Sequence, residues 1–247
     1  MEVSGFGRIY PTGVRGMKVS VIVPNNGRNI EKLVDSIKNS TYRNTELIVI
    51  DRGKERSVQR NMGIVEATGQ AFLILDSDQS VSPNLIQECV DLVECGYEAI
   101  YIPEIIMADS FFGKVRAVER EFYTGTEVDV PRFVTRKVCP LFNTELSGPE
   151  DAEWGQRIKG IRTISECVLY HNDDIGFIDY CKKKAYYTKS MKRYKELCPD
   201  DQCLNLKYRC FDVFVQDGKW KHLLAHPILT ICVFFLLIVR GFIYAKR

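Results

Sequence analysis

Short apolar runs and stretches of helical spacing alternate along the chain from residue 18 onward. Apolar runs at 19–23, 47–50, 71–75 and 99–102 predict strands. Between the first two runs, Ile30, Leu33, Val34 and Ile37 recur at the spacing of one helix face. Similar stretches follow the second and third runs. This βαβαβαβ order predicts an α/β fold with an open, mostly parallel twisted sheet and helices on both faces.

Polar residues or proline follow three of the predicted strands. Pro24, Asp51 and Asp76 each stand at the carboxyl end of a different strand. Open α/β sheets bind ligands beyond these ends, so the three residues are expected to meet in one crevice. No GxGxxG or GxxxxGK[ST] follows the first strand, which argues against a dinucleotide oxidoreductase and a P-loop nucleotidase.

The sequence Asp76-Ser77-Asp78 is the first candidate for chemistry. It directly follows the apolar run 71–75. Two carboxylates spaced i, i+2 at a strand end suit Mg²⁺ or Mn²⁺, which can neutralise a nucleotide diphosphate as it leaves. Asp-x-Asp also occurs in ordinary surface turns, so the other parts of the chain must decide between the two interpretations.

Charge is distributed unevenly, and this points to a membrane. Residues 1–180 carry 20 basic and 27 acidic side chains, whereas residues 181–247 carry 14 and 5. The basic part leads into His222–Val239, 18 residues without Lys, Arg, Asp or Glu, and Arg240 could extend a span to Ala245 by snorkelling. This order favours a membrane over nucleic acid, with a buried helix of a soluble core as the alternative. Basic residues flank both ends and only mildly favour a cytoplasmic catalytic part.

Five blocks, in this order, resemble one family. The chain is similar to an inverting family 2 glycosyltransferase with a GT-A fold over roughly residues 17–195. The blocks are Val19–Pro24, Leu47–Asp51, Glu55–Ile64, Asp76-Ser77-Asp78, and Gly148-Pro149-Glu150-Asp151 with Arg157 after it.

The resemblance implies roles on the donor side of the site. Pro24 and Asp51 would border the nucleotide, and Arg60 and Asn61 would form a wall near its ribose or diphosphate. Asp76 would face the nucleotide, and Asp76 and Asp78 would hold Mg²⁺ or Mn²⁺. His171 would lie near the metal, although a structural histidine is equally compatible with its position.

Asp151 is the candidate general base, with Glu150 as the alternative. An inverting transfer needs a carboxylate opposite the leaving diphosphate to take the proton of the incoming hydroxyl. Arg157 would belong to the acceptor side. Arg132 lies in the segment 105–140, where basic and aromatic residues fit a sugar or lipid-phosphate acceptor and also fit plain packing.

The expected organisation has four parts. They are an N-terminal extension (1–16), a glycosyltransferase domain (17–180), a basic interfacial segment (181–221) that includes a helix at 182–195, and a membrane helix (222–247). The QxxRW motif of processive synthases is absent, which favours the transfer of one sugar. We therefore expect a nucleotide-sugar donor, UDP- or GDP-linked, and a lipid acceptor such as a polyprenyl or dolichyl phosphate or a lipid-linked glycan. The alternatives are a sugar-1-phosphate nucleotidyltransferase and a non-catalytic membrane-tethered module that binds nucleotide-sugars.

Overall fold

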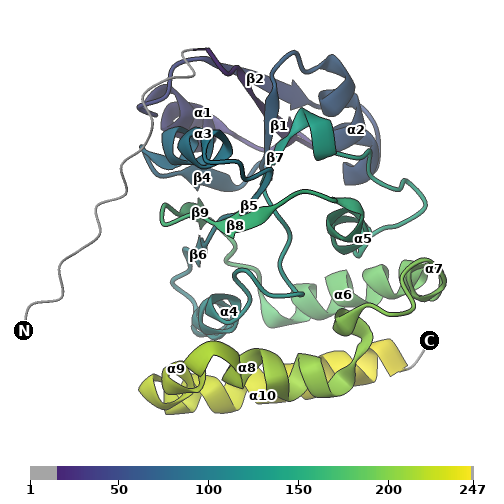
Figure 1. The fold of residues 1–247 in the computed structure, drawn as a ribbon. Coiled ribbons are helices and arrows are strands. Elements are labelled where there is room, and N and C mark those ends of the chain that lie inside the picture. Colours follow the sequence, from purple (N-terminus) through teal and green to yellow (C-terminus); the bar gives the residue numbers. More distant parts are fainter. Residues whose placement is uncertain (1–15, 246–247) are drawn as a thin grey trace, which may run out of the picture.

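The computed structural model describes residues 16–245, and a mixed sheet forms its centre (Figure 1). The order in the larger sheet is β2-β1-β3-β7-β5-β8. The strands are β1 (Val19–Pro24), β2 (Thr45–Ile50), β3 (Ala71–Ile74), β5 (Ala99–Tyr101), β7 (Phe133–Thr135) and β8 (Arg162–Ile164). The pairs β1–β2, β1–β3 and β5–β8 are parallel, which confirms the expected, mostly parallel sheet.

One strand departs from the predicted order. β7 lies between β3 and β5 and is antiparallel to both. The pattern of the sequence did not reveal this strand, because it has only three residues and lies within the segment interpreted as the acceptor side. A second, smaller sheet has the order β4-β9-β6, with β4 (Gln79–Val81), β6 (Glu104–Ile106) and β9 (Leu169–His171).

Helices cover both faces of the larger sheet, as predicted. Alternate residues of β1 face opposite sides, since side chains alternate along a strand. Val21 packs with α1 (Glu31–Lys38) and α3 (Leu85–Glu94), and Ile22 packs with α2 (Arg56–Glu66) and α5 (Glu150–Arg157). The first three strands are therefore held between two apolar layers.

A third layer of helices lies below the sheet in Figure 1. It contains α4 (Phe111–Glu121), α6 (Phe177–Tyr187), α7 (Met191–Leu197), α8 (Val213–Val215), α9 (Trp220–Ala225) and α10 (Pro227–Ala245). α10 lies along α4 and α6, and Val233 and Leu237 are buried against the apolar side of α4. The C-terminal helix is thus part of the folded body.

Two expectations about this layer were wrong. Arg240 does not snorkel: it is 8% exposed and pairs with Glu119 of α4. The helix expected at 182–195 is interrupted after Tyr187 by a 3-10 turn, and α7 begins at Met191. Both segments pack onto the domain, where Arg240 finds a carboxylate partner and Lys184 lines a cavity. Residues 1–15 and 246–247 lie outside the described residues, so almost all of the expected extension and the last two basic residues are not described.

Candidate functional site

The carboxyl ends of β1, β2 and β3 form one edge of the sheet, which we call the donor edge. Because these strands are parallel, Pro24, Asp51 and Asp76 all lie at this edge, as expected. Pro24 is buried and Asp51 is exposed. Among residues 16–245, no hydrogen bond or ion pair is found for the Asp51 side chain, so its carboxylate is available to a ligand.

Hydrogen bonds to Gln79 and Asn172 hold the turn that carries Asp76 and Asp78. The Asp76 N–H donates to Gln79 Oε1 at 2.9 Å, and the Gln79 N–H donates to the Asp76 carbonyl at 3.1 Å. The Asn172 N–H donates to the Asp78 carbonyl at 2.9 Å, which ties the turn to the end of β9. The two carboxylates therefore stand on rigid backbone.

Two arginines contact the Asp76 carboxylate. Arg60 Nη2 donates to Asp76 Oδ1 at 2.8 Å, and Arg132 Nη1 lies 3.6 Å from Oδ2. Burial alone would raise the pKa of Asp76, but the charges of Arg60, Arg132 and Arg56 hold it well below its usual range. In this arrangement Asp76 is ionised and positions two cations at the donor edge.

The register of β4 and β9 brings His171 to Asp78. Gln79 pairs with His171, so the imidazole Nε2 lies 3.3 Å from Asp78 Oδ1, while Nδ1 contacts Glu104 of β6. Burial lowers the pKa of His171, but the contacts with Asp78 and Glu104 outweigh it and raise the pKa to about 9.

These contacts bear on the expected metal. Asp78 Oδ1 is buried and faces only His171 within the described part of the chain, while Asp78 Oδ2 pairs with Arg28. A carboxylate that orients a histidine through its other nitrogen is a recurring feature of metal sites. Asp78 and His171, backed by Glu104, would supply two ligands to a divalent cation, which would have to displace Arg28 from Asp78 and take its remaining ligands from phosphate and water. No cluster of three or more His, Cys, Asp or Glu suited to a metal occurs in residues 16–245.

Glu150 and Asp151, at the start of α5, lie in different environments. Glu150 is 2% exposed, lies 3.3 Å from Arg56 Nη2 and 3.5 Å from Arg60 Nη1, and accepts from the Gly148 N–H at 2.5 Å. Burial and the neighbouring Asp151 raise the pKa of Glu150. Asp151 is half-buried and accepts only from the Ala152 N–H, at 2.9 Å, among the described residues. Asp151 is therefore the freer carboxylate.

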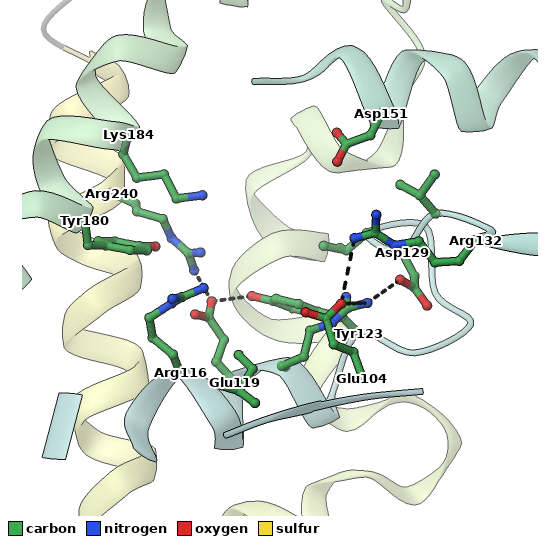
Figure 2. A pocket seen from close by; sticks show the side chains of 14 residues that line it. Glu104, Arg116, Glu119, Tyr123, Asp129, Arg132, Asp151, Tyr180, Lys184 and Arg240 are labelled. Carbon is green, nitrogen blue, oxygen red and sulfur yellow. Dashed lines mark hydrogen bonds and ion pairs between the residues drawn. The ribbon is translucent and has the colours of Figure 1, made fainter. Parts of the chain in front are cut away.

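Asp151 lines a cavity of about 240 Å³ between the donor edge and the third layer (Figure 2). Arg132 and Glu104 line the same cavity, and Arg132 Nη2 lies 3.8 Å from Glu104 Oε2. The cavity is thus continuous with the side chains around Asp76 and His171. It is lined mainly by charged groups, as Figure 2 shows.

Two predicted site residues lie elsewhere. The Asn61 amide donates to the Phe142 carbonyl at 2.9 Å and accepts from the Phe142 N–H at 2.7 Å, so it holds a loop. Arg157 donates to Glu153 at 2.5 and 2.8 Å and to the Leu141 carbonyl at 2.6 Å, and it is not among the residues that line the cavity.

Several residues at the site were not identified from the sequence. Glu104 carries no motif, and Arg56 lies in the Glu55–Ile64 block but was given no role there; only the register of β6 and the start of α2 place them. Tyr180, Lys184 and Arg240 also line the cavity. A lone arginine in an apolar helix was the one available signal for Arg240, because such a charge is usually paired or functional.

The chain is similar to known proteins in part of its sequence and in its fold. Residues 52–144 match the model of glycosyl transferase family 2. No sequence among curated proteins matches the chain. A crystal structure of S. aureus TarS is similar with a TM-score of 0.50 and 14% identity, covering 93% of this chain and 53% of TarS. A structure of S. aureus TarS 1-349 in complex with UDP-GlcNAc has a TM-score of 0.50 and 13% identity, covering 91% of this chain and 81% of that one.

The molecule therefore has the GT-A fold, and this chain spans about half the length of TarS. The fold and the family match together support a family 2 glycosyltransferase. The matched segment contains the Asp76–Asp78 turn, Arg60 and Arg132, whereas His171 and the Glu150–Asp151 pair lie outside it.

Proposed function

We propose that the protein transfers a single sugar, with inversion, from a UDP- or GDP-sugar to a lipid or lipid-linked acceptor at the cytoplasmic face of a membrane. The observation that carries this proposal is the arrangement around the cavity. The donor edge supplies Asp76 and its arginines, and the free carboxylate of Asp151 lines the same cavity from α5. The complex of TarS with UDP-GlcNAc supports a nucleotide-sugar donor.

On the donor side, exposed Asp51 would accept hydrogen bonds from the base or ribose. Arg60 is held rigidly, because it is 1% exposed and its Cζ lies 5.1 Å from the centroid of the Phe142 ring. A fixed guanidinium next to Asp76 suits the diphosphate oxygens. The Asn61 contacts with Phe142 support the wall behind this site and turn the amide toward the loop.

Asp78 and His171 would hold Mg²⁺ or Mn²⁺, with Asp76 beside them. The bound cation would supply positive charge to the diphosphate as it leaves. For this role His171 must be neutral at Nε2, and Glu104 would keep the proton on Nδ1.

Asp151 would take the proton from the acceptor hydroxyl. Glu150 is fixed by Arg56, Arg60 and the Gly148 N–H, so it is poorly placed to rotate toward an acceptor. The carboxylate of Asp151 is in the first turn of α5 and lines the cavity. If the acceptor is itself a phosphate, this proton transfer is not needed.

Membrane attachment would use the outer face of α10. By length and composition this helix could cross a membrane. Its outer face is a stripe of exposed apolar residues: Ile228, Ile231, Phe235, Ile238 and Phe242. Its inner face packs on α4 and α6 with the buried Arg240–Glu119 pair, so we infer that it inserts along the surface.

The test is the release of UDP or GDP from a panel of nucleotide-sugars, with Mn²⁺ and membrane lipid extract. Asp78→Ala should abolish release, and Asp151→Asn should reduce transfer far more than donor binding. Asp35→Ala is the matched control, because Asp35 is exposed and lies 4.0 Å from Lys38. The anomeric configuration of the product, read by NMR, tests inversion.

Three results would contradict the proposal. Unchanged turnover of Asp78→Ala would refute the metal assignment. Formation of pyrophosphate from a nucleoside triphosphate and a sugar 1-phosphate would indicate a nucleotidyltransferase. Donor binding without any turnover would indicate a non-catalytic module.

A further inference from the structure

The cavity beside Asp151 has two ends of different charge. Figure 2 shows Arg132, Asp129 and Glu104 grouped at one end, and Lys184 and Arg240 at the other, with Arg116 near them. We call this second group the cationic end. It is built from α4, α6 and α10, away from the donor edge.

One positive charge at the cationic end is not compensated. Arg116 pairs with Asp173, and Arg240 pairs with Glu119. Lys184 has no carboxylate partner among the described residues, and its ammonium lies over the rings of Tyr180 and Tyr187, at 5.3 and 5.4 Å from their centroids. Burial, and then the charge of Arg240, lower the pKa of Lys184 to about 7. An anion in the cavity would stabilise its charged form.

A buried hydroxyl provides a second, independent observation. Tyr180 is 3% exposed and lines the cavity, yet its hydroxyl makes no hydrogen bond within residues 16–245. A buried polar group without a partner costs stability, which makes it a candidate for a bound ligand. The guanidinium of Arg116 also lies near the Tyr180 ring, at 5.4 Å from its centroid. This ring therefore contacts two cations, Arg116 and Lys184.

We propose that the cationic end binds the phosphate group of the acceptor lipid, with the Tyr180 hydroxyl, the Lys184 ammonium and the guanidinium groups of Arg116 and Arg240 as donors. This inference rests on the proposed function and names the class of acceptor. Phosphate oxygens accept several hydrogen bonds at once, and lysine and arginine are the usual partners of phosphate.

The position of the cavity favours a lipid over free phosphate. α10 supplies Arg240 to the cavity from its inner face and exposes its apolar stripe on the outer face. A lipid whose chain lies beside α10 could therefore place its phosphate against Arg240. A volume of about 240 Å³ accommodates a headgroup and not the chain.

The test measures binding to the full-length protein in detergent micelles by calorimetry. The probes are farnesyl phosphate, farnesol and inorganic phosphate. The wild type should bind farnesyl phosphate at least about tenfold more tightly than farnesol, since a hydrogen bond to a charged group is worth about that factor or more. It should also bind farnesyl phosphate at least about tenfold more tightly than inorganic phosphate, since burial of two or more CH₂ groups of the chain is worth about that factor. Tyr180→Phe and Lys184→Met should each lose about tenfold in this affinity.

The matched control is Lys182→Met, on the same helix but with a side chain 73% exposed, and it should bind like the wild type. Tyr180→Phe should also melt no lower than the wild type, because it removes only the unpartnered hydroxyl. A purely structural role for the hydroxyl would instead lower the melting temperature and leave affinity unchanged.

Wild-type affinity in both cavity variants would overturn the proposal, and inorganic phosphate binding as tightly as farnesyl phosphate would overturn its lipid part. Release of UDP or GDP that depends on Asp78, together with unchanged phosphate binding in the variants, would refute this inference alone. Phosphate binding lost in the variants of a protein that turns over no donor would refute the transferase proposal and support the phosphate site.

Discussion

Arg60→Met tests how the donor edge is held together. The Arg60 guanidinium is buried between two acidic side chains, 2.8 Å from Asp76 and 3.5 Å from Glu150. Methionine keeps an unbranched apolar stem and carries no charge, so the substitution removes the ion pairs and the guanidinium that lies over Phe142. It leaves two carboxylates with fewer partners.

The expected loss is large for a single substitution. Removing one partner of a buried ion pair costs about 3–5 kcal/mol of stability. Asp76 keeps Arg132 at 3.6 Å, and Glu150 keeps Arg56 at 3.3 Å. Because these partners remain, we expect the lower end of the range, about 3 kcal/mol at pH 7.5.

The loss should depend on pH. Burial and Asp151 already raise the pKa of Glu150, and Arg60 is one of the charges that oppose this rise. A carboxyl with a raised folded pKa binds its proton more tightly when folded, so stability increases as the pH falls through that window. Each tenfold change in proton affinity is worth about 1.4 kcal/mol. The difference between variant and wild type should therefore shrink between pH 7.5 and 5.

The contribution of Asp76 to stability depends on pH with the opposite sign. Its folded pKa is depressed, so its contribution is present above the unfolded pKa of about 3.9 and is lost as the pH falls through the folded value. Measurements at pH 5 and above therefore keep the contribution of Asp76 in the wild type.

Urea unfolding in detergent, followed by tryptophan fluorescence, measures this effect. Trp154 is 1% exposed and stacks on Phe142 with ring centroids 4.6 Å apart, so it reports on this region. Arg52→Met is the control, because Arg52 pairs with Glu66 at the surface, where such pairs contribute about 0–1 kcal/mol. A loss below about 1 kcal/mol for Arg60→Met, or a loss that does not change with pH, would refute the reasoning.

Three further predictions follow. Asn61→Ala should lower stability by about 2 kcal/mol in urea unfolding, because the backbone of Phe142 loses both partners. Its affinity for UDP should stay unchanged. Weaker UDP binding at unchanged stability would instead indicate that Asn61 contacts the donor. Glu119→Gln should cost about 3–5 kcal/mol of stability in the same assay, since it leaves Arg240 buried without a charged partner. A cost near zero would show that α10 does not stay packed on the domain. Phe235→Glu should move the protein from liposomes to the soluble fraction in flotation assays without unfolding it, whereas Val65→Glu, at an even more exposed apolar site on α2, should float like the wild type.

The donor edge could be predicted from the sequence because it follows from local patterns. A buried parallel strand reads as a short apolar run, and the residue after it must lie at the carboxyl edge of the sheet. Pro24, Asp51 and Asp76 needed no long-range information beyond the parallel order of β1, β2 and β3.

The other parts of the site depend on contacts that no local pattern encodes. Glu104 reaches His171 only through the pairing of β6 with β9, and Glu119 pairs with Arg240 across 121 positions in the sequence. A basic run such as 182–184 predicts an exposed face, and docking of α6 then decides which lysine turns inward. Lys184 lines the cavity, whereas Lys182 pairs with Asp179 at the surface.

Arg132 connects the two halves of this site. Its Nη1 lies 3.6 Å from Asp76 and its Nη2 lies 3.8 Å from Glu104, distances at which charges attract but no hydrogen bond forms. Arg60 and His171 already satisfy the same two carboxylates through closer contacts. Arg132 is therefore the least committed of the cations at the donor edge, and it also lines the cavity that Asp151 faces. Of these cations, it can turn toward an incoming oxygen at the smallest cost in existing contacts.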